Sequence, residues 1–265
     1  VRSASAEQQA AYVAVLAKLV RLESLDMEPF VAADFCAVRL PLLKRLNICL
    51  PDCTPPAALQ QLFGNLPLLE DCTVDCFELP TDAQDLVPVR SPASAPVATL
   101  AHLKRLELAI ADDALVSSFK LPVLNVLNLR TSSSRVKQLE QALYLMPSLT
   151  QLWLCGDVHF SAPTAKLCST GQTLWIADPT ISHSNFLHML RSFPALRKVD
   201  IRAESKQLGL HALSSIALFQ PSEMRSIKLS GDFIGESVAA ADLGLLFQLC
   251  PLLDTIELAA SQEPM

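Results

Sequence analysis

The chain has 265 residues, a formal net charge of −6 and a mean hydropathy of +0.33, and 51% of its residues are apolar. Acidic and basic residues are mixed along the chain without a basic stripe, which argues against nucleic acid as the main ligand. No apolar run approaches the roughly 18–20 residues that a membrane span needs. We therefore expect neither a nucleic acid nor a membrane as partner.

One short phrase recurs along the chain: an apolar residue, a proline, one further residue and then Leu-x-x-apolar-x-apolar. Its aligned prolines are Pro41, Pro67, Pro122, Pro147, Pro194 and Pro251. Copies without this proline begin at Leu22, Leu103, Gly171 and Met224. The phrase recurs about every 26 residues, inside the window of about 20–29 residues that leucine-rich repeats occupy. The sequence predicts one α/β domain over residues 1–265, a leucine-rich-repeat solenoid of about ten irregular units.

Each unit is expected to contain one strand and one return segment. The Leu-x-x-Leu-x-Leu stretch predicts a short strand whose alternate apolar side chains point inward. These strands would form a curved parallel sheet on the concave side, and the return segments would form helices on the convex side. Proline cannot continue a helix and disfavours helical geometry for the residue before it. We therefore expect the recurrent proline to fix the switch from helix to strand.

Two features are expected in the first part of the chain besides the strands. A helix over 6–19 would cap the solenoid at its N-terminus, within residues 1–20. A second helix, over 57–63, is opened by Pro55 and Pro56 and closed by Gly64 and Asn65.

The longest interval between two copies contains residues 80–99, which are rich in proline and serine and predict a loop insertion. This insertion lies either on a binding face or in a tolerated surface loop. Further return helices are expected over 135–145 and 185–192, after the capping residues Ser134 and Ser184, and over 235–249.

The eight cysteines are interpreted as reduced structural residues. Cys72 replaces a motif leucine and Cys250 precedes Pro251, both at core positions where a thiol acts as a small hydrophobe. A metal site or a disulfide is the alternative. The chain has no Asn-x-Ser/Thr acceptor site, and no signal-peptide pattern follows Val1. Together these features favour a reducing compartment, the cytoplasm or the nucleus.

The sequence predicts a protein that is not an enzyme and that needs no cofactor or metal. It contains none of the common phosphate-binding, zinc-protease or nucleophile-elbow motifs. Its five histidines are scattered and are expected to be exposed or hydrogen-bonded, and Asp112 and Asp113 are expected to be solvated turn residues.

The strand phrase also predicts which side chains point outward onto the concave face. The central outward residues of successive strands are Asp26, Asn47, Thr73, Glu107, Asn128, Trp153, Trp175, Asp200, Lys228 and Glu257. The next outward positions include Arg130 and Arg202. The two tryptophans of the chain therefore fall in neighbouring strands, which lie about 4.8 Å apart.

Tryptophan and arginine are enriched at interface hot spots. The candidate partner-binding residues are therefore Trp153, Trp175, Asn128, Arg130, Glu107, Asp200, Arg202 and Lys228. The alternative is that the two indoles lie flat on the strands and stack on each other for stability.

The Leu-Pro-x-Leu phrase at 40–43 and 66–69, the irregular unit lengths and the lack of an asparagine three residues after the last leucine resemble the leucine-rich regions of F-box proteins. The nearest resemblance is to the divergent set from filamentous and mushroom-forming fungi, and it covers nearly the whole chain. It implies the substrate-binding region of a receptor in a Skp1–cullin ubiquitin ligase. Skp1 would then be a partner through an F-box outside this chain, since no such segment precedes the repeats. The alternatives are a horseshoe-shaped enzyme regulator, of the ribonuclease-inhibitor or GTPase-activating kind, and a structural scaffold.

Overall fold

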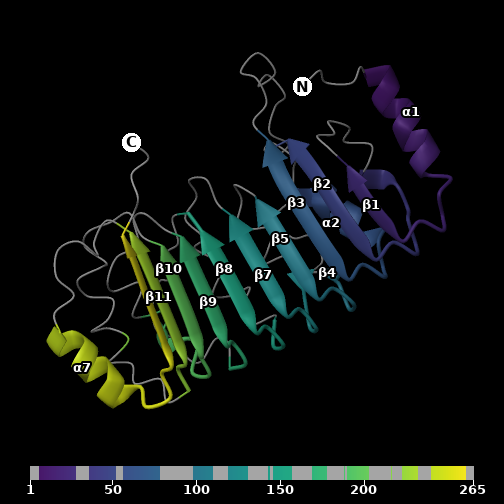
Figure 1. The fold of residues 1–265 in the computed structure, drawn as a ribbon. Helices are drawn as coiled ribbons and strands as arrows, with labels where there is room; N and C mark the ends of the chain where they lie inside the picture. Colours follow the sequence, from purple (N-terminus) through teal and green to yellow (C-terminus); the bar gives the residue numbers. More distant parts are fainter. Residues whose placement is uncertain are drawn as a thin grey trace, which may run out of the picture.

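The computed structural model describes residues 6–27, 36–51, 56–77, 98–109, 119–130, 143, 146–156, 169–177, 188, 190–202, 216, 223–231 and 240–260. These residues contain a parallel sheet of ten strands, stacked as a solenoid in the order β1-β2-β3-β5-β7-β8-β9-β10-β11-β12. Each strand pairs with the next one along the chain, so the sheet grows in sequence order (Figure 1). The parallel sheet and the stacked units confirm the predicted solenoid architecture.

The strands occupy the predicted Leu-x-x-Leu-x-Leu segments. Their bounds are β1 Ser24–Met27, β2 Arg45–Pro51, β3 Asp71–Phe77, β5 Arg105–Ala109, β7 Val126–Arg130, β8 Gln151–Cys155, β9 Thr173–Ala177, β10 Lys198–Arg202, β11 Ser226–Gly231 and β12 Thr255–Ala260. Parallel strands need a crossover between them, and a unit of about 26 residues is long enough to supply it.

The recurrent proline lies in a tight turn before the strand, and after α2 and α7 this turn separates the helix from the strand, as the sequence predicts. Leu43 donates its backbone N–H to the carbonyl of Leu40, which closes a four-residue turn with Pro41 at its second position. Seven other copies of the phrase, that at Leu22 included, close the same turn, at donor–acceptor distances of 2.9–3.4 Å. Proline suits the second turn position because its ring presets φ. The copy at Leu100 forms this turn with Ala101 in place of proline, so the proline favours the turn without being required for it.

The starts of the strands are joined by a second repeated backbone pattern. The carbonyl of Lys44 accepts two N–H groups from the next unit, those of Glu70 and Asp71, at 2.8 and 3.0 Å. The equivalent carbonyl in each unit from Glu23 to Arg225 accepts two bonds in the same way. Backbone groups that a turn would otherwise leave without partners are thus satisfied between neighbouring units.

The core lies on the inward face of the sheet and is a single cluster of apolar side chains. Each strand of this sheet from β2 to β11 contributes at least two buried positions to it, such as Leu152 and Leu154 in β8, which are 1% and 0% exposed. Cys72 and Cys250 are buried in the same cluster, as the sequence predicts.

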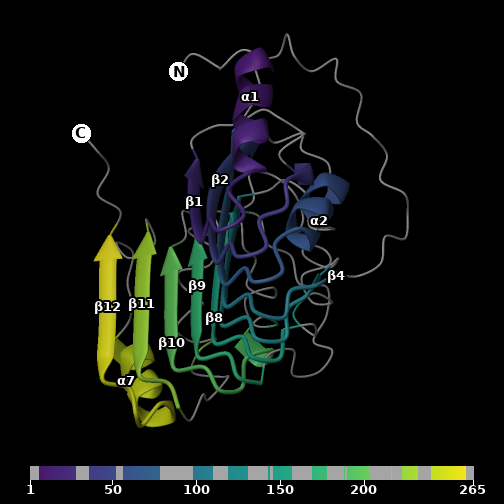
Figure 2. The same ribbon diagram turned by 90° about the vertical axis from the view of Figure 1, so that its right-hand side faces the viewer.

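Three helices are described. Helix α1 (Ala6–Leu16) lies at the N-terminal end and α7 (Ala240–Leu249) at the C-terminal end (Figure 1). Helix α2 (Pro56–Gly64) lies to one side of the sheet (Figure 2) and buries Leu59 and Leu62 in the core. In the described part of the chain, no helix is both long and apolar enough to cross a membrane.

These helices confirm part of the predicted set. The helix expected over 57–63 is present as α2, whereas α1 ends at Leu16 and not at residue 19. The described part of the last helix begins at Ala240. The helices expected over 135–145 and 185–192 lie largely outside the described residues, although His188 and Leu190 are helical. Helices along the convex side therefore stay a prediction for most units.

The end of the expected insertion is part of the fold. Residues 80–97 lie outside the described residues, but Ala98–Thr99 forms β4, which pairs in parallel with β6 (Phe119–Lys120). Phe119 packs edge-on against Phe63 of α2, with ring centroids 5.1 Å apart. This two-stranded sheet therefore joins two units away from the main sheet.

Candidate functional site

The central outward column predicted from the strand phrase is present without a break. Strand pairing aligns Asp26, Asn47, Thr73, Glu107, Asn128, Trp153, Trp175, Asp200, Lys228 and Glu257 across the ten strands. We call the surface formed by this column and the outward residues two positions before and after it the outward face. The core side chains lie on the other face of the sheet, so the outward face is where a partner could contact the strands.

The tryptophan pair lies in the middle of the outward face. Trp153 on β8 and Trp175 on β9 occupy directly paired positions. Their rings stack with centroids 5.5 Å apart and an angle of 30° between the planes. Trp153 nevertheless keeps 38% of its surface exposed, and Trp175 is half-buried. The indoles thus stabilise each other, as one of the two interpretations expected, and still present aromatic surface, as the other required.

Uncharged residues surround this pair on its own two strands. The outward positions of β8 and β9 pair as Gln151 with Thr173, Trp153 with Trp175, and Cys155 with Ala177. A block of two strands without charge is therefore available in a sheet face that is otherwise rich in charges.

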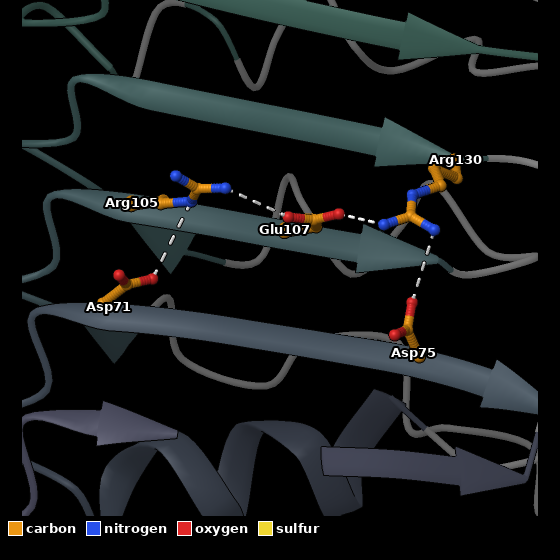
Figure 3. A network of polar contacts seen from close by, with 5 residues as sticks. All are labelled: Asp71, Asp75, Arg105, Glu107 and Arg130. Carbon is orange, nitrogen blue, oxygen red and sulfur yellow. Dashed lines mark hydrogen bonds and ion pairs between the residues drawn. The ribbon is translucent and has the colours of Figure 1, made fainter. Parts of the chain in front are cut away.

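A network of ion pairs lies on the N-terminal side of the tryptophans, across β3, β5 and β7 (Figure 3). At its centre is Glu107, which is only 8% exposed. Its carboxylate contacts the guanidinium of Arg130 in a short hydrogen bond and that of Arg105 at 3.5 Å. Asp75 then lies 3.7 Å from Arg130, and Asp71 lies 4.0 Å from Arg105.

This network engages two of the predicted binding residues. The hydrogen bond that Arg130 donates to the carboxylate of Glu107 raises the pKa of Arg130, against the opposing effect of burial. Arg130 and Glu107 therefore neutralise each other within the sheet and do not offer free charges to a partner. The sequence reasoning placed both residues correctly but did not predict that they bind each other.

The C-terminal side of the tryptophans is arranged differently. Asp200 on β10 pairs in register with Trp175 on one side and Lys228 on the other. Burial raises the pKa of Asp200, while the nearby charges of Lys228, Lys198 and Arg202 act in the opposite direction. Lys228 itself forms an ion pair with Glu257 at 2.9 Å.

Lys198 and Arg202 are the two cations on this side that remain available. Both are exposed, and they lie two residues before and two residues after Asp200. Among the described residues, neither takes part in an ion pair within 4.0 Å. Lys198 was not among the predicted binding residues, because the prediction used only the central column and the positions after it. The same alternation extended two residues upstream would have included Lys198, Arg105 and Asp71.

A hollow of about 390 Å³ lies at the starts of β2, β3 and β5 and is lined only by charged residues. Within it Lys44 pairs with Glu23 at 3.0 Å, and Lys104 pairs with Glu70 at 2.7 Å. The bond from Lys104 lowers the pKa of Glu70. Because these charges neutralise each other between successive units, we interpret the hollow as part of the repeat structure.

The described cysteines and histidines form no reactive or metal-binding cluster. Cys36, Cys49, Cys72 and Cys250 are free thiols, and no group of three potential metal ligands occurs among the described residues. Burial raises the pKa of Cys36 to about 11 and raises that of Cys72 further. Such thiols are poor nucleophiles at neutral pH because little thiolate is present.

One histidine differs from the expectation. Nδ1 of His188 is buried and has no hydrogen-bond partner in the described part of the structure, where the sequence reasoning expected an exposed or hydrogen-bonded ring. His102 is exposed, as expected. Asp112 and Asp113 lie outside the described residues.

Comparison with models of known protein families gives no match, and comparison with curated proteins gives none either.

Proposed function

We propose that the outward face of the sheet recognises a protein partner, with the stacked pair of Trp153 and Trp175 as its anchor. The observation that carries this proposal is the partial exposure of Trp153 at the centre of an unbroken ten-strand surface, inside an uncharged block. A large aromatic surface left in water at the middle of a stacked sheet is the arrangement that a binding hot spot requires.

The exposed part of Trp153 sets how much this anchor can contribute. Covering the exposed 38% of one indole is worth on the order of 2 kcal/mol before the costs of association. That is too little for specific binding alone, so a partner must also contact the neighbouring strands. The outward face provides those contacts on both sides of the pair.

The test compares Trp153→Ala with a matched control, Phe247→Ala. Phe247 is a 54% exposed aromatic residue on α7, away from the outward face. Proteins that bind the wild-type chain in affinity purification should be retained by the Phe247 variant and lost from the Trp153 variant. Thermal unfolding of both variants shows whether the fold survives. If the Trp153 variant keeps its fold and its partners, the anchor is not used for recognition.

We further propose that this recognition serves a ubiquitin ligase, with the chain as the substrate-binding region of an F-box-type receptor. The stacked parallel solenoid supports this proposal, together with the resemblance of the Leu-Pro-x-Leu phrase to such proteins. The experiment is co-purification of the full-length gene product with Skp1. Partner binding through Trp153 without any bound Skp1 would leave the recognition function and remove the ligase role.

A further inference from the structure

The charges on the two sides of the tryptophan pair are not equivalent, and this difference indicates what kind of segment the surface binds. On the N-terminal side, Arg105 and Arg130 are held by the carboxylates of Asp71, Glu107 and Asp75. A ligand on that side meets cations that already have anionic partners, and it would have to break these pairs to gain new ones.

On the C-terminal side, β10 carries Lys198, Asp200 and Arg202 on the outward face. These residues pair in register with Thr173, Trp175 and Ala177. Both cations are thus one strand away from Trp175, about 4.8 Å in the direction of the sheet, and displaced about 6.5 Å along the strand in opposite directions. Asp200 lies between them but forms no ion pair with either within 4.0 Å in the described structure.

This side of the surface therefore disfavours a basic ligand. A lysine or arginine placed over β10 would face Lys198 and Arg202, whereas the neighbouring Lys228 is already paired with Glu257. The one carboxylate there, Asp200, is partly buried and already lies in the field of these cations. A carboxylate placed over β10 would instead find one exposed ammonium and one exposed guanidinium group that have no ion-pair partner among the described residues. Such groups favour charge-assisted hydrogen bonds.

We propose that the bound segment is an acidic peptide, with an apolar side chain seated on Trp153 and Trp175 and with aspartates or glutamates held by Arg202 or by Lys198. This inference rests on the proposed recognition function and adds the chemistry of the partner to it. The net charge of −6 repels such a segment at long range. Salt screens that repulsion over about 8 Å at physiological ionic strength, so the local cations determine binding at contact.

The probe is a random peptide display library selected against the immobilised wild-type chain. Enriched peptides should combine an apolar or aromatic residue with aspartate or glutamate a few positions away. A peptide from this pool is then synthesised with a fluorescent label, together with a version whose acidic residues are replaced by Gln or Asn. Fluorescence anisotropy should show that the neutral version binds at least about tenfold more weakly.

Charge reversal locates the contact. Arg202→Glu and Lys198→Glu should each weaken the acidic peptide about tenfold, whereas Lys120→Glu should have little effect. Lys120 is an exposed lysine of β6, outside the main sheet, and its reversal changes the net charge equally. A peptide with lysine in place of its acidic residue should regain affinity for the Arg202→Glu chain. Circular dichroism of each variant shows whether it is folded. Arg202→Gln, which removes the charge without reversing it, is the milder variant at this position.

The outcomes separate this inference from the function on which it rests. The proposal of an acidic partner would be overturned if basic or uncharged peptides were enriched. It would also be overturned if Arg202→Glu and Lys120→Glu weakened binding equally while Trp153→Ala abolished it. Either result would leave the recognition surface intact. The recognition surface itself would be contradicted if the Trp153→Ala chain selected the same peptides as the wild-type chain. It would also be contradicted if the wild-type chain enriched no peptide relative to the Trp153→Ala chain.

Discussion

Glu107 is a carboxylate in an unusual position for a solenoid face, because it is 8% exposed and lies in the same column as polar and aromatic residues that face solvent. Burying a charge is costly unless the charge is paired and hydrogen-bonded. Arg105 supplies that pairing from the same strand, and Arg130 supplies it from the next strand of the sheet. The two arginines therefore have a structural role that their exposure, about half for each side chain, would not suggest.

Removing Arg130 should consequently destabilise the chain. We expect Arg130→Met to lower the free energy of unfolding by about 1–2 kcal/mol, since Glu107 loses its main partner while solvent and Arg105 screen part of the loss. Urea denaturation measures this change. Arg202→Met is the matched control, because Arg202 is an exposed arginine without a described ion pair, and it should have little effect. Glu107→Gln in the Arg130→Met background should restore part of the lost stability, and failure to do so would contradict the assigned role.

Asp200 gives a prediction that depends on pH. Its pKa is raised in the folded chain, mainly by burial, so folding favours its protonated form. Its contribution to stability is present below the unfolded pKa of about 3.9 and is lost as the pH rises through the folded pKa. Asp200→Asn should therefore raise the melting temperature slightly at pH 7, and the gain should vanish below about pH 4. The same substitution should strengthen binding of an acidic peptide, because it removes an anion beside Arg202. A lower melting temperature at pH 7 would show that attraction to the neighbouring cations outweighs burial.

At the scale of elements, the turn that precedes each strand explains the proline phrase and allows a stabilising substitution. Ala101 occupies the second position of the turn between Leu100 and Leu103, where six other copies have proline. In the described structure, the backbone N–H of Ala101 donates no hydrogen bond among the backbone hydrogen bonds of turns and loops. Ala101→Pro should therefore stabilise the chain by about 0.4–1 kcal/mol through a less flexible unfolded state.

Pro122→Ala is the matched control for this substitution, because Pro122 has the same place in the next copy of the phrase. It should lower the melting temperature by a comparable amount. A lower melting temperature for Ala101→Pro would mean that Leu100, which also bonds to Lys120, cannot accept the restriction that a following proline imposes.

The elements differ in how far the sequence predicts them. Ten strands and their outward residues could be predicted, because each strand alternates apolar and polar residues and this pattern is local. The pairing of β4 with β6 could not be predicted from the sequence. Each of these strands has only two residues, too few to show a period, and their pairing depends on the positions of neighbouring units. The contact between Glu107 and Arg130 was also missed, because strand periodicity gives the face on which a side chain lies but not the rotamer that selects its partner.

At the scale of the whole molecule, each unit of the solenoid contacts its sequence neighbours through the sheet, so stability should vary along the array. One inward column shows the difference. Leu154 in β8 and Leu229 in β11 are fully buried, whereas Leu258, the corresponding residue of the last strand, is 36% exposed. In the described structure, strand β12 pairs with β11 alone. Its inward side chains therefore pack against a neighbouring strand on one side only.

The same substitution should therefore have different effects at two positions of this column. Leu154→Ala removes a fully buried side chain between two neighbouring units, and it should cost about 2–5 kcal/mol. It should also broaden the urea transition, because it weakens the coupling between the two halves of the array. Leu258→Ala removes a side chain that is partly in water at the edge of the sheet, and it should cost about 1 kcal/mol. Its effect should appear as faster hydrogen exchange confined to β12, with the main transition retained. The contrary result would be an equal loss of unfolding free energy in the two variants, with faster hydrogen exchange spread over all strands. That result would mean that the ten strands unfold as one cooperative unit.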